Sequence, residues 1–239
     1  MTKSSEPRVR YVLAFSGTFL PVCKAGGPVK SMVQLLDNLP ESVRVVLGTR
    51  DRDLGDAVPY EGLSGTAISH GAHEVLYLNC RDPRHWMMLL RMARRIPIDL
   101  IYLSSLWSPQ FTIHPIAAQR LDLLPAGGII LAPRGELSSG ALSLKSAKMR
   151  AFLHIGAPLL RRADPLWHAS TEMEQRDIMW TFPWARTVIH ADGRGDDPLK
   201  EIVGSEERAR FSATCSRCPS APAVTPRSGS GEHRWRTAR

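Results

Sequence analysis

The sequence has little cysteine and no long apolar run. Four cysteines in 239 residues are too few and too scattered for the disulfide framework of a small secreted domain. No apolar stretch approaches the roughly 18–20 residues that span a bilayer, because residues such as Arg91, Arg94 and Arg95 interrupt the best candidate. The N-terminus also lacks the features of a signal peptide. These absences predict a cytoplasmic protein.

Phosphate-binding motifs and metal-ligand spacings are missing as well. No segment reads G-x-G-x-x-G or G-x-x-x-x-G-K-[ST], so the usual signals of a dinucleotide site and of a P-loop are absent. The histidines up to His168 are not spaced as metal ligands, and His168 itself fits a structural role in a strand. Cys215 and Cys218, with His233 further on, form only half of a zinc motif. We therefore expect no metal and no cofactor.

Positive charge is abundant but unevenly placed. The net charge is +8 and the isoelectric point is about 9.7, and residues 206–239 carry seven arginines against three glutamates. That segment is rich in Ser, Pro, Ala and Gly, so it buries too little apolar surface to offset the entropy of ordering it. We therefore predict a folded domain over residues 1–195 and a disordered basic tail over 196–239. A nucleic-acid binder would gather its charge in one stripe beside aromatic residues, so no nucleic-acid partner is expected.

The part before the tail alternates apolar and amphipathic segments. The apolar segments, which predict buried strands, cover residues 9–16, 43–49, 74–78, 98–104, 128–132, 166–170 and 186–191. Helices are predicted over 28–36, 83–95, 112–123 and 143–163, the last kinked or broken near Gly156 and Pro158. Thr171 and Glu174 have capping-box spacing before one more helix. This alternation predicts an α/β fold, with a Rossmann-like, mostly parallel sheet and helices on both faces.

Ligands of an open parallel sheet bind beyond the carboxyl ends of its strands, which selects four loops, over residues 17–27, 50–56, 104–111 and 133–137. Two of them carry candidate binding residues. Gly26 and Gly27 open a helix whose N–H groups and positive dipole end favour an anion such as a diphosphate; a plain tight turn is the alternative. Arg134 directly follows a buried strand, where its guanidinium could pair with phosphate or carboxylate. Glu136 could orient Arg134 or accept a proton, and a weak surface ion pair is the alternative there.

Two amphipathic stretches are basic. Residues 85–95 and 145–162 each combine several Lys or Arg side chains with large apolar ones. Such helices could lie on an anionic membrane surface. An ordinary surface helix with a solvated basic face is the alternative reading of both.

Taken in order, several segments resemble the N-terminal domain of family 4 glycosyltransferases, the group 1 family with the GT-B fold. The matching segments are Pro21–Val22 with Gly26–Pro28, Val46–Asp53 (VLGTRDRD), Asp99–Phe111 (DLIYLSSLWSPQF), Ile130–Leu142 (ILAPRGELSSGAL), Lys145–Phe152, and Ala163–Ser170 with Glu172. The resemblance runs from about residue 8 to residue 190, and P-R-G-x-L followed by a basic helix is its most specific part.

The resemblance implies transfer of a sugar from a nucleotide-diphosphate donor to a glycan or lipid-linked acceptor, in polysaccharide or cell-envelope biosynthesis. Helix N-termini and basic side chains then neutralise the leaving diphosphate without a metal, and the protein works in the cytoplasm or at the inner face of the cell membrane. The implied roles are donor-diphosphate binding by Gly26, Gly27 and Lys30, catalysis by Arg134 and Glu136, and an acceptor-side position for Asp51, Ser104 and Gly135. Many relatives have a histidine where this chain has Pro-Arg-Gly, so no catalytic histidine is assigned.

After about residue 190 the sequence no longer resembles the family. Relatives bind the nucleotide sugar mainly with a second Rossmann-like domain that carries an E-x7-E motif, and no glutamate here has another eight positions later. We therefore expect a truncated glycosyltransferase with little activity alone, for which an out-of-frame gene end is one explanation. The alternative is a non-catalytic Rossmann-like binding module.

Overall fold

A single sheet organises the computed structural model, which describes residues 9–22, 24, 26–144 and 146–190. The strands are β1 (Arg10–Ser16), β2 (Val43–Arg50), β3 (Ala67–His70), β4 (His73–Leu78), β5 (Ile98–Ser104), β6 (Ile129–Ala132), β7 (Leu166–Ala169) and β8 (Arg186–Ile189). Their order is β3-β4-β2-β1-β5-β6-β7-β8. All neighbours pair in parallel except β3 and β4. The predicted α/β fold with a mostly parallel sheet is confirmed.

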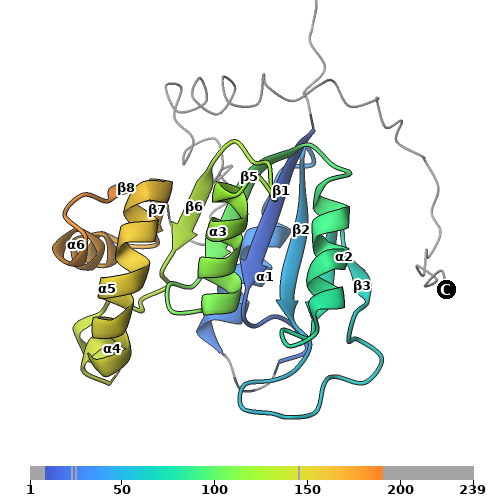
Figure 1. Ribbon diagram of the computed structural model, residues 1–239, viewed down its shortest axis with the longest axis horizontal. Coiled ribbons are helices and arrows are strands. Elements are labelled where there is room, and N and C mark those ends of the chain that lie inside the picture. The colour runs from blue at the N-terminus through green and yellow to red at the C-terminus, as the bar shows by residue number, and fades with distance from the viewer. Residues whose placement is uncertain (1–8, 23, 25, 145, 191–239) are drawn as a thin grey trace, which may run out of the picture.

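Helices cover both faces of the sheet (Figure 1). They are α1 (Gly27–Asp37), α2 (Pro83–Ala93), the π-helical turn η1 (Pro109–Ile113), α3 (His114–Arg120), α4 (Ser139–Leu144), α5 (Ser146–Ala163) and α6 (Glu172–Thr181). Helix α1 packs Met32 and Leu36 against one face. The opposite face receives Leu89 of α2, Ile116 of α3 and Leu160 of α5.

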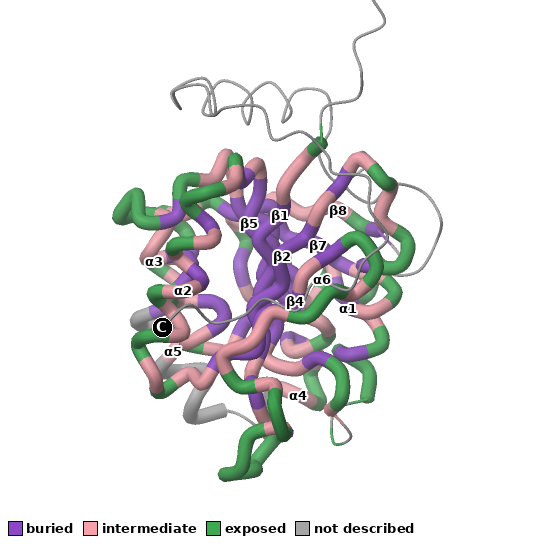
Figure 2. Tube along the Cα trace, turned by 90° about the vertical axis from the view of Figure 1, so that its right-hand side faces the viewer, coloured by how far each residue is buried: buried purple, intermediate pink, exposed green. Residues whose placement is uncertain are grey.

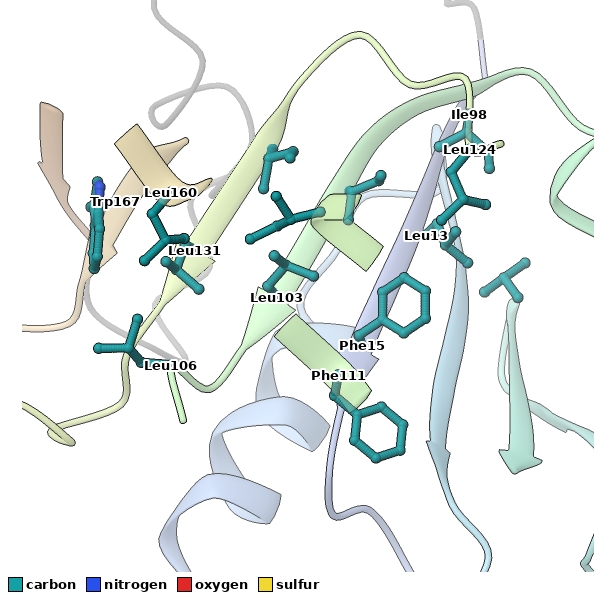
Figure 3. Close-up of a cluster of buried hydrophobic side chains, with 14 of the residues drawn as sticks. Leu13, Phe15, Ile98, Leu103, Leu106, Phe111, Leu124, Leu131, Leu160 and Trp167 are labelled. Carbon is teal, nitrogen blue, oxygen red and sulfur yellow. The ribbon is translucent and has the colours of Figure 1, made fainter. Parts of the chain in front are cut away.

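The alternation of side chains along each strand explains this two-sided core. In β1, Leu13 and Phe15 belong to the cluster under α2, α3 and α5, whereas Val12 and Ala14 face α1. Because successive residues of a strand point to opposite faces, a strand buried on both sides must be almost wholly apolar. Figure 2 shows the central strands as the most buried part of the molecule. In Figure 3, apolar side chains run continuously from Trp167 to Leu13.

The structure differs from the predicted elements in three details. Antiparallel β3 was not predicted, because its exposed, partly polar residues lack the apolar pattern of the other strands. Helix α5 continues through Pro158, so the predicted break does not occur, while a kink near Gly156 and Pro158 stays a prediction. Thr171 accepts a hydrogen bond from the backbone N–H of Glu174 at 3.1 Å, but the carboxylate of Glu174 binds the preceding residue, Ser170, so only half of the capping box forms.

Strand order determines where a ligand can bind. The chain goes from β1 through α1 to β2 on one side, and later returns to place β5 on the other side of β1. The connections after β1 and β5 therefore diverge, which leaves a crevice between the carboxyl ends of these two strands.

Several sequence predictions fall outside this description. The basic tail over 196–239 and the half zinc motif of Cys215, Cys218 and His233 lie outside the described residues. Within the described part of the chain, no helix is long and apolar enough to cross a membrane.

Candidate functional site

A cleft of about 400 Å³ lies at the switch point between β1 and β5. Its walls come from loops that follow β1, β2, β5 and β6 and from the start of α1. The lining residues are Gly17, Thr18, Pro28, Arg50, Leu54, Ser104, Ser105, Trp107, Ser108, Pro109, Gln110, Arg134 and Glu136. Three residues predicted from the sequence, Ser104, Arg134 and Glu136, are thus brought together in one cleft.

Arg134 is fixed by an unusual backbone and a buried hydrogen-bond chain. Arg134 and Gly135 have consecutive positive φ angles of 57° and 73°, a conformation that costs a residue with a side chain about 1 kcal/mol or more. The Arg134 guanidinium donates to the hydroxyl of Tyr102 at 2.8 Å. That hydroxyl lies 2.9 Å from Nδ1 of buried His168, whose Nε2 lies 2.9 Å from the carbonyl oxygen of His190. This series of hydrogen bonds holds the Arg134 guanidinium at the cleft.

The Glu174 carboxylate stabilises the turn that contains Arg134 by hydrogen bonds. The Glu174 side chain is only 6% exposed. One carboxylate oxygen accepts from the Gly135 backbone N–H at 2.7 Å, and the other accepts from the backbone N–H and the hydroxyl of Ser170 at 2.8 and 2.7 Å. A single carboxylate thus ties the loop after β6 to the loop after β7. Gly135 contributes to the site through this backbone contact and does not line the cleft.

Glu136 organises the neighbouring loop. Its carboxylate accepts from the Ser105 hydroxyl at 3.0 Å and from the backbone N–H groups of Leu106 and Trp107 at 2.6 and 3.3 Å. Its carbonyl oxygen accepts from the Trp107 indole at 3.3 Å. These contacts shape the loop after β5, so a positioning role suits Glu136 better than proton transfer.

Ser104 supplies a buried polar atom at the base of the cleft. The residue is 4% exposed, and its hydroxyl oxygen has no hydrogen-bond partner within the described residues. A buried hydroxyl that lacks a partner costs about 1–3 kcal/mol. Because Ser104 also lines the cleft, a polar ligand group could satisfy this hydroxyl.

The start of α1 is open toward this edge of the sheet. Gly26 is the N-cap and makes no side-chain cap, and Pro28 lies in the first turn. A side chain built at Gly26 or Gly27 would meet nothing within 4 Å, so a ligand can approach the helix N-terminus closely. Pro28 lines the cleft, whereas Gly26, Gly27 and Lys30 lie outside its lining.

Asp51 acts within its own loop and does not line the cleft. It is fully buried, and its carboxylate accepts from Arg52 at 2.8 Å and from the Ser64 hydroxyl at 2.6 Å. Burial opposes the charged form, but the hydrogen bonds from Arg52 and Ser64 outweigh it and hold the pKa of Asp51 below its ordinary value. The charged carboxylate therefore fixes the position of Arg52.

The two basic stretches correspond to α2 and α5. In α2, Trp86 packs against the core and its indole donates to the carbonyl oxygen of Cys80 at 3.2 Å, while Arg84 and Arg91 are exposed. The aromatic side chain of this helix therefore packs within the domain, and Arg84 and Arg91 face solvent. In α5, Arg161 and Arg162 are exposed.

Two residues that position the Arg134 turn, Tyr102 and Glu174, were not predicted as site residues from the sequence. The sequence pattern shows Tyr102 only as part of an apolar strand, and Glu174 only at capping-box spacing from Thr171. Only the strand order, which puts β5, β6 and β7 side by side, brings Tyr102, Arg134 and Glu174 together. Among the described residues, no group of three or more His, Cys, Asp or Glu side chains could hold a metal ion.

No protein-family model matches the chain, and no curated protein matches it significantly in sequence. The assignment of function therefore depends on the geometry of the cleft and on the sequence resemblance.

Proposed function

We propose that this chain is the acceptor-side domain of a GT-B-type glycosyltransferase, and that the cleft holds the diphosphate and sugar of a nucleotide-sugar donor beside an acceptor hydroxyl. The observation that carries the proposal is the position of Arg134, whose guanidinium is held by Tyr102 in a cleft at the switch point of a parallel sheet. An anion-binding group at this place is what a diphosphate requires.

The reaction needs no covalent chemistry from the protein. The bond between the anomeric carbon and the diphosphate oxygen breaks, a bond from that carbon to the acceptor oxygen forms, and the hydroxyl proton passes to the departing diphosphate. Arg134 stabilises the negative charge that develops on the diphosphate, and the positive dipole end of α1, which meets the cleft at Pro28, adds to this effect. Ser104 offers a hydrogen bond to a sugar or acceptor hydroxyl. Glu136 keeps the loop after β5 in place.

By the family resemblance, most donor contacts come from a second domain. We therefore expect the acceptor-side domain by itself to bind nucleotide sugars weakly, with a dissociation constant of about 1 mM, which corresponds to a binding free energy of about −4 kcal/mol. We expect no turnover from this domain by itself.

Calorimetric titration with a panel of nucleoside-diphosphate sugars tests the proposal. The wild-type chain should bind at least one donor, and Arg134→Gln should weaken binding by about tenfold, as expected for loss of a charge-assisted hydrogen bond. Arg120→Gln is the matched control, because Arg120 is an exposed arginine at the end of α3. Absence of binding to every donor, or equal binding by Arg134→Gln, would refute the proposal. Binding that depends on Arg134, with no sugar transfer after a donor domain is added, would favour a non-catalytic binding module.

A further inference from the structure

A second cavity, of about 440 Å³, lies beside the cleft and is lined by arginines. We call it the arginine pocket and define it by Arg50, Arg52, Arg81, Asn79, Cys80 and Gln110. Its walls come from the end of β2, the loops after β2 and β4, and η1. Arg50 and Gln110 line both the arginine pocket and the cleft, so the two cavities are neighbours with shared walls.

The charge of the arginine pocket is not balanced by its own residues. Arg52 donates to the buried carboxylate of Asp51 and to the carbonyl oxygen of Ala57, which fixes its side chain. Within the described part of the chain, no carboxylate forms an ion pair with Arg50 or Arg81. Asp56 also lines the pocket, but it is paired with Lys24.

Such an arrangement selects an anion of high charge density. Arginine presents several N–H donors in one plane, which suits the oxygens of a phosphate group. Asn79 adds a further polar side chain. Its amide oxygen Oδ1 accepts a hydrogen bond from the Arg81 backbone N–H at 3.1 Å. The arginine pocket is therefore lined by arginines from two neighbouring strand ends, with Arg50 and Arg52 at and after the end of β2 and Arg81 after β4.

We propose that the arginine pocket binds a phosphate group carried by the acceptor, so that the acceptor hydroxyl reaches the cleft past Arg50 and Gln110. The assignment of this phosphate to an acceptor rests on the proposed function. The pocket's preference for phosphate rests on its arginines. The substrate class is thus a phosphorylated acceptor, whose phosphate belongs either to a lipid headgroup or to a small soluble molecule.

Alkylation of Cys80 reports on occupancy of the pocket. Cys80 lines it and is half-buried, so a bound anion should shield its thiol. The rate is measured by mass spectrometry of the Cys80 peptide, with and without inorganic pyrophosphate, in sodium chloride of matched ionic strength. Pyrophosphate should slow the alkylation by about fivefold or more in the wild-type chain and in Arg120→Gln, whereas Arg81→Gln should lose the protection. Arg81 is exposed and lines the arginine pocket but not the cleft, so this variant should fold and leave the cleft intact.

Two further arms identify the source of the phosphate. Protection by soluble glycerol phosphate indicates a small phosphorylated acceptor. Protection by phosphatidic acid in phosphatidylcholine vesicles, but not by phosphatidylcholine alone or by glycerol phosphate, indicates a lipid headgroup. No protection by pyrophosphate, or equal protection in Arg81→Gln, would overturn the proposal. The proposed function is tested by a different experiment, the calorimetric titration of nucleotide sugars with the wild-type chain and Arg134→Gln. The two proposals can therefore fail independently.

Discussion

Substitution of Glu174 by glutamine tests whether one carboxylate holds the turn of Arg134. Both carboxylate oxygens accept backbone N–H groups, at 2.7 Å from Gly135 and 2.8 Å from Ser170. Glutamine must turn its own NH₂ donor toward one of these N–H groups, which leaves that partly buried group without its acceptor, at a cost of about 1–3 kcal/mol. The remaining bond changes from charged to neutral and loses about 1 kcal/mol more. The free energy of unfolding should therefore fall by about 2–4 kcal/mol in total.

Urea unfolding of the whole chain, followed by circular dichroism, measures this change. The control is Glu172→Gln, because Glu172 lies on the same helix but is exposed, with only a long ion pair to Arg176 at 3.5 Å; its cost should stay below about 0.5 kcal/mol. Thermal unfolding should agree, since each kcal/mol lowers Tm by about 2–4 °C in a domain of this size. A Glu174→Gln variant as stable as Glu172→Gln would refute the role given to this carboxylate.

Three further predictions follow from the site and the core. Glu136→Gln should lower the free energy of unfolding by about 1–3 kcal/mol in urea, because its carboxylate holds the backbone N–H of Leu106 at 2.6 Å; unchanged stability would argue against the positioning role. Tyr102→Phe should weaken nucleotide-sugar binding by about threefold to tenfold in calorimetry, because the Arg134 guanidinium loses the hydroxyl at 2.8 Å; equal affinity would contradict it. Burial lowers the pKa of His73 from 6.5, so its stabilising effect is complete above pH 6.5 and is lost as the pH falls from there toward the lower folded pKa, with a slope of up to about 1.4 kcal/mol per pH unit. In His73→Gln, the midpoint of urea unfolding should depend less on pH below pH 6.5 than it does in the wild-type chain. A wild-type midpoint that does not change with pH below 6.5 would refute the effect.

The fold could be predicted because local signals agree with it. Strands such as β1 and β5 are almost wholly apolar since both faces of the sheet are covered. Pro28 and Pro83 mark the starts of α1 and α2, where the missing N–H of proline costs nothing. Strand β3 carries no such pattern, because it lies at the edge of the sheet with two exposed residues.

The candidate site could be predicted only in part. Arg134 and Ser104 could be predicted as site residues because each lies at or just beyond the carboxyl end of a buried strand, where parallel sheets bind ligands, and the family resemblance adds the role of Ser104. Tyr102 and Glu174 were not assigned to the site, because their contacts with the Arg134 turn span 32 and 39 residues of sequence. The arginine pocket was not predicted, since Arg50 ends β2 and Arg81 follows β4, and the two residues come to line one cavity only through the pairing of these strands.

The most direct test of the central claim is the indole NMR signal of Trp107 in chain labelled with ¹⁵N-tryptophan, titrated with nucleoside-diphosphate sugars. Trp107 lines the cleft, and Trp180, which is 89% exposed on α6, is an internal control outside the cleft lining. We predict that the Trp107 signal, assigned with Trp107→Phe, shifts saturably in the wild-type chain but not in Arg134→Gln, while the Trp180 signal stays in place. A Trp107 signal that no donor moves, or that moves equally in Arg134→Gln, would contradict the claim that this cleft binds a nucleotide sugar.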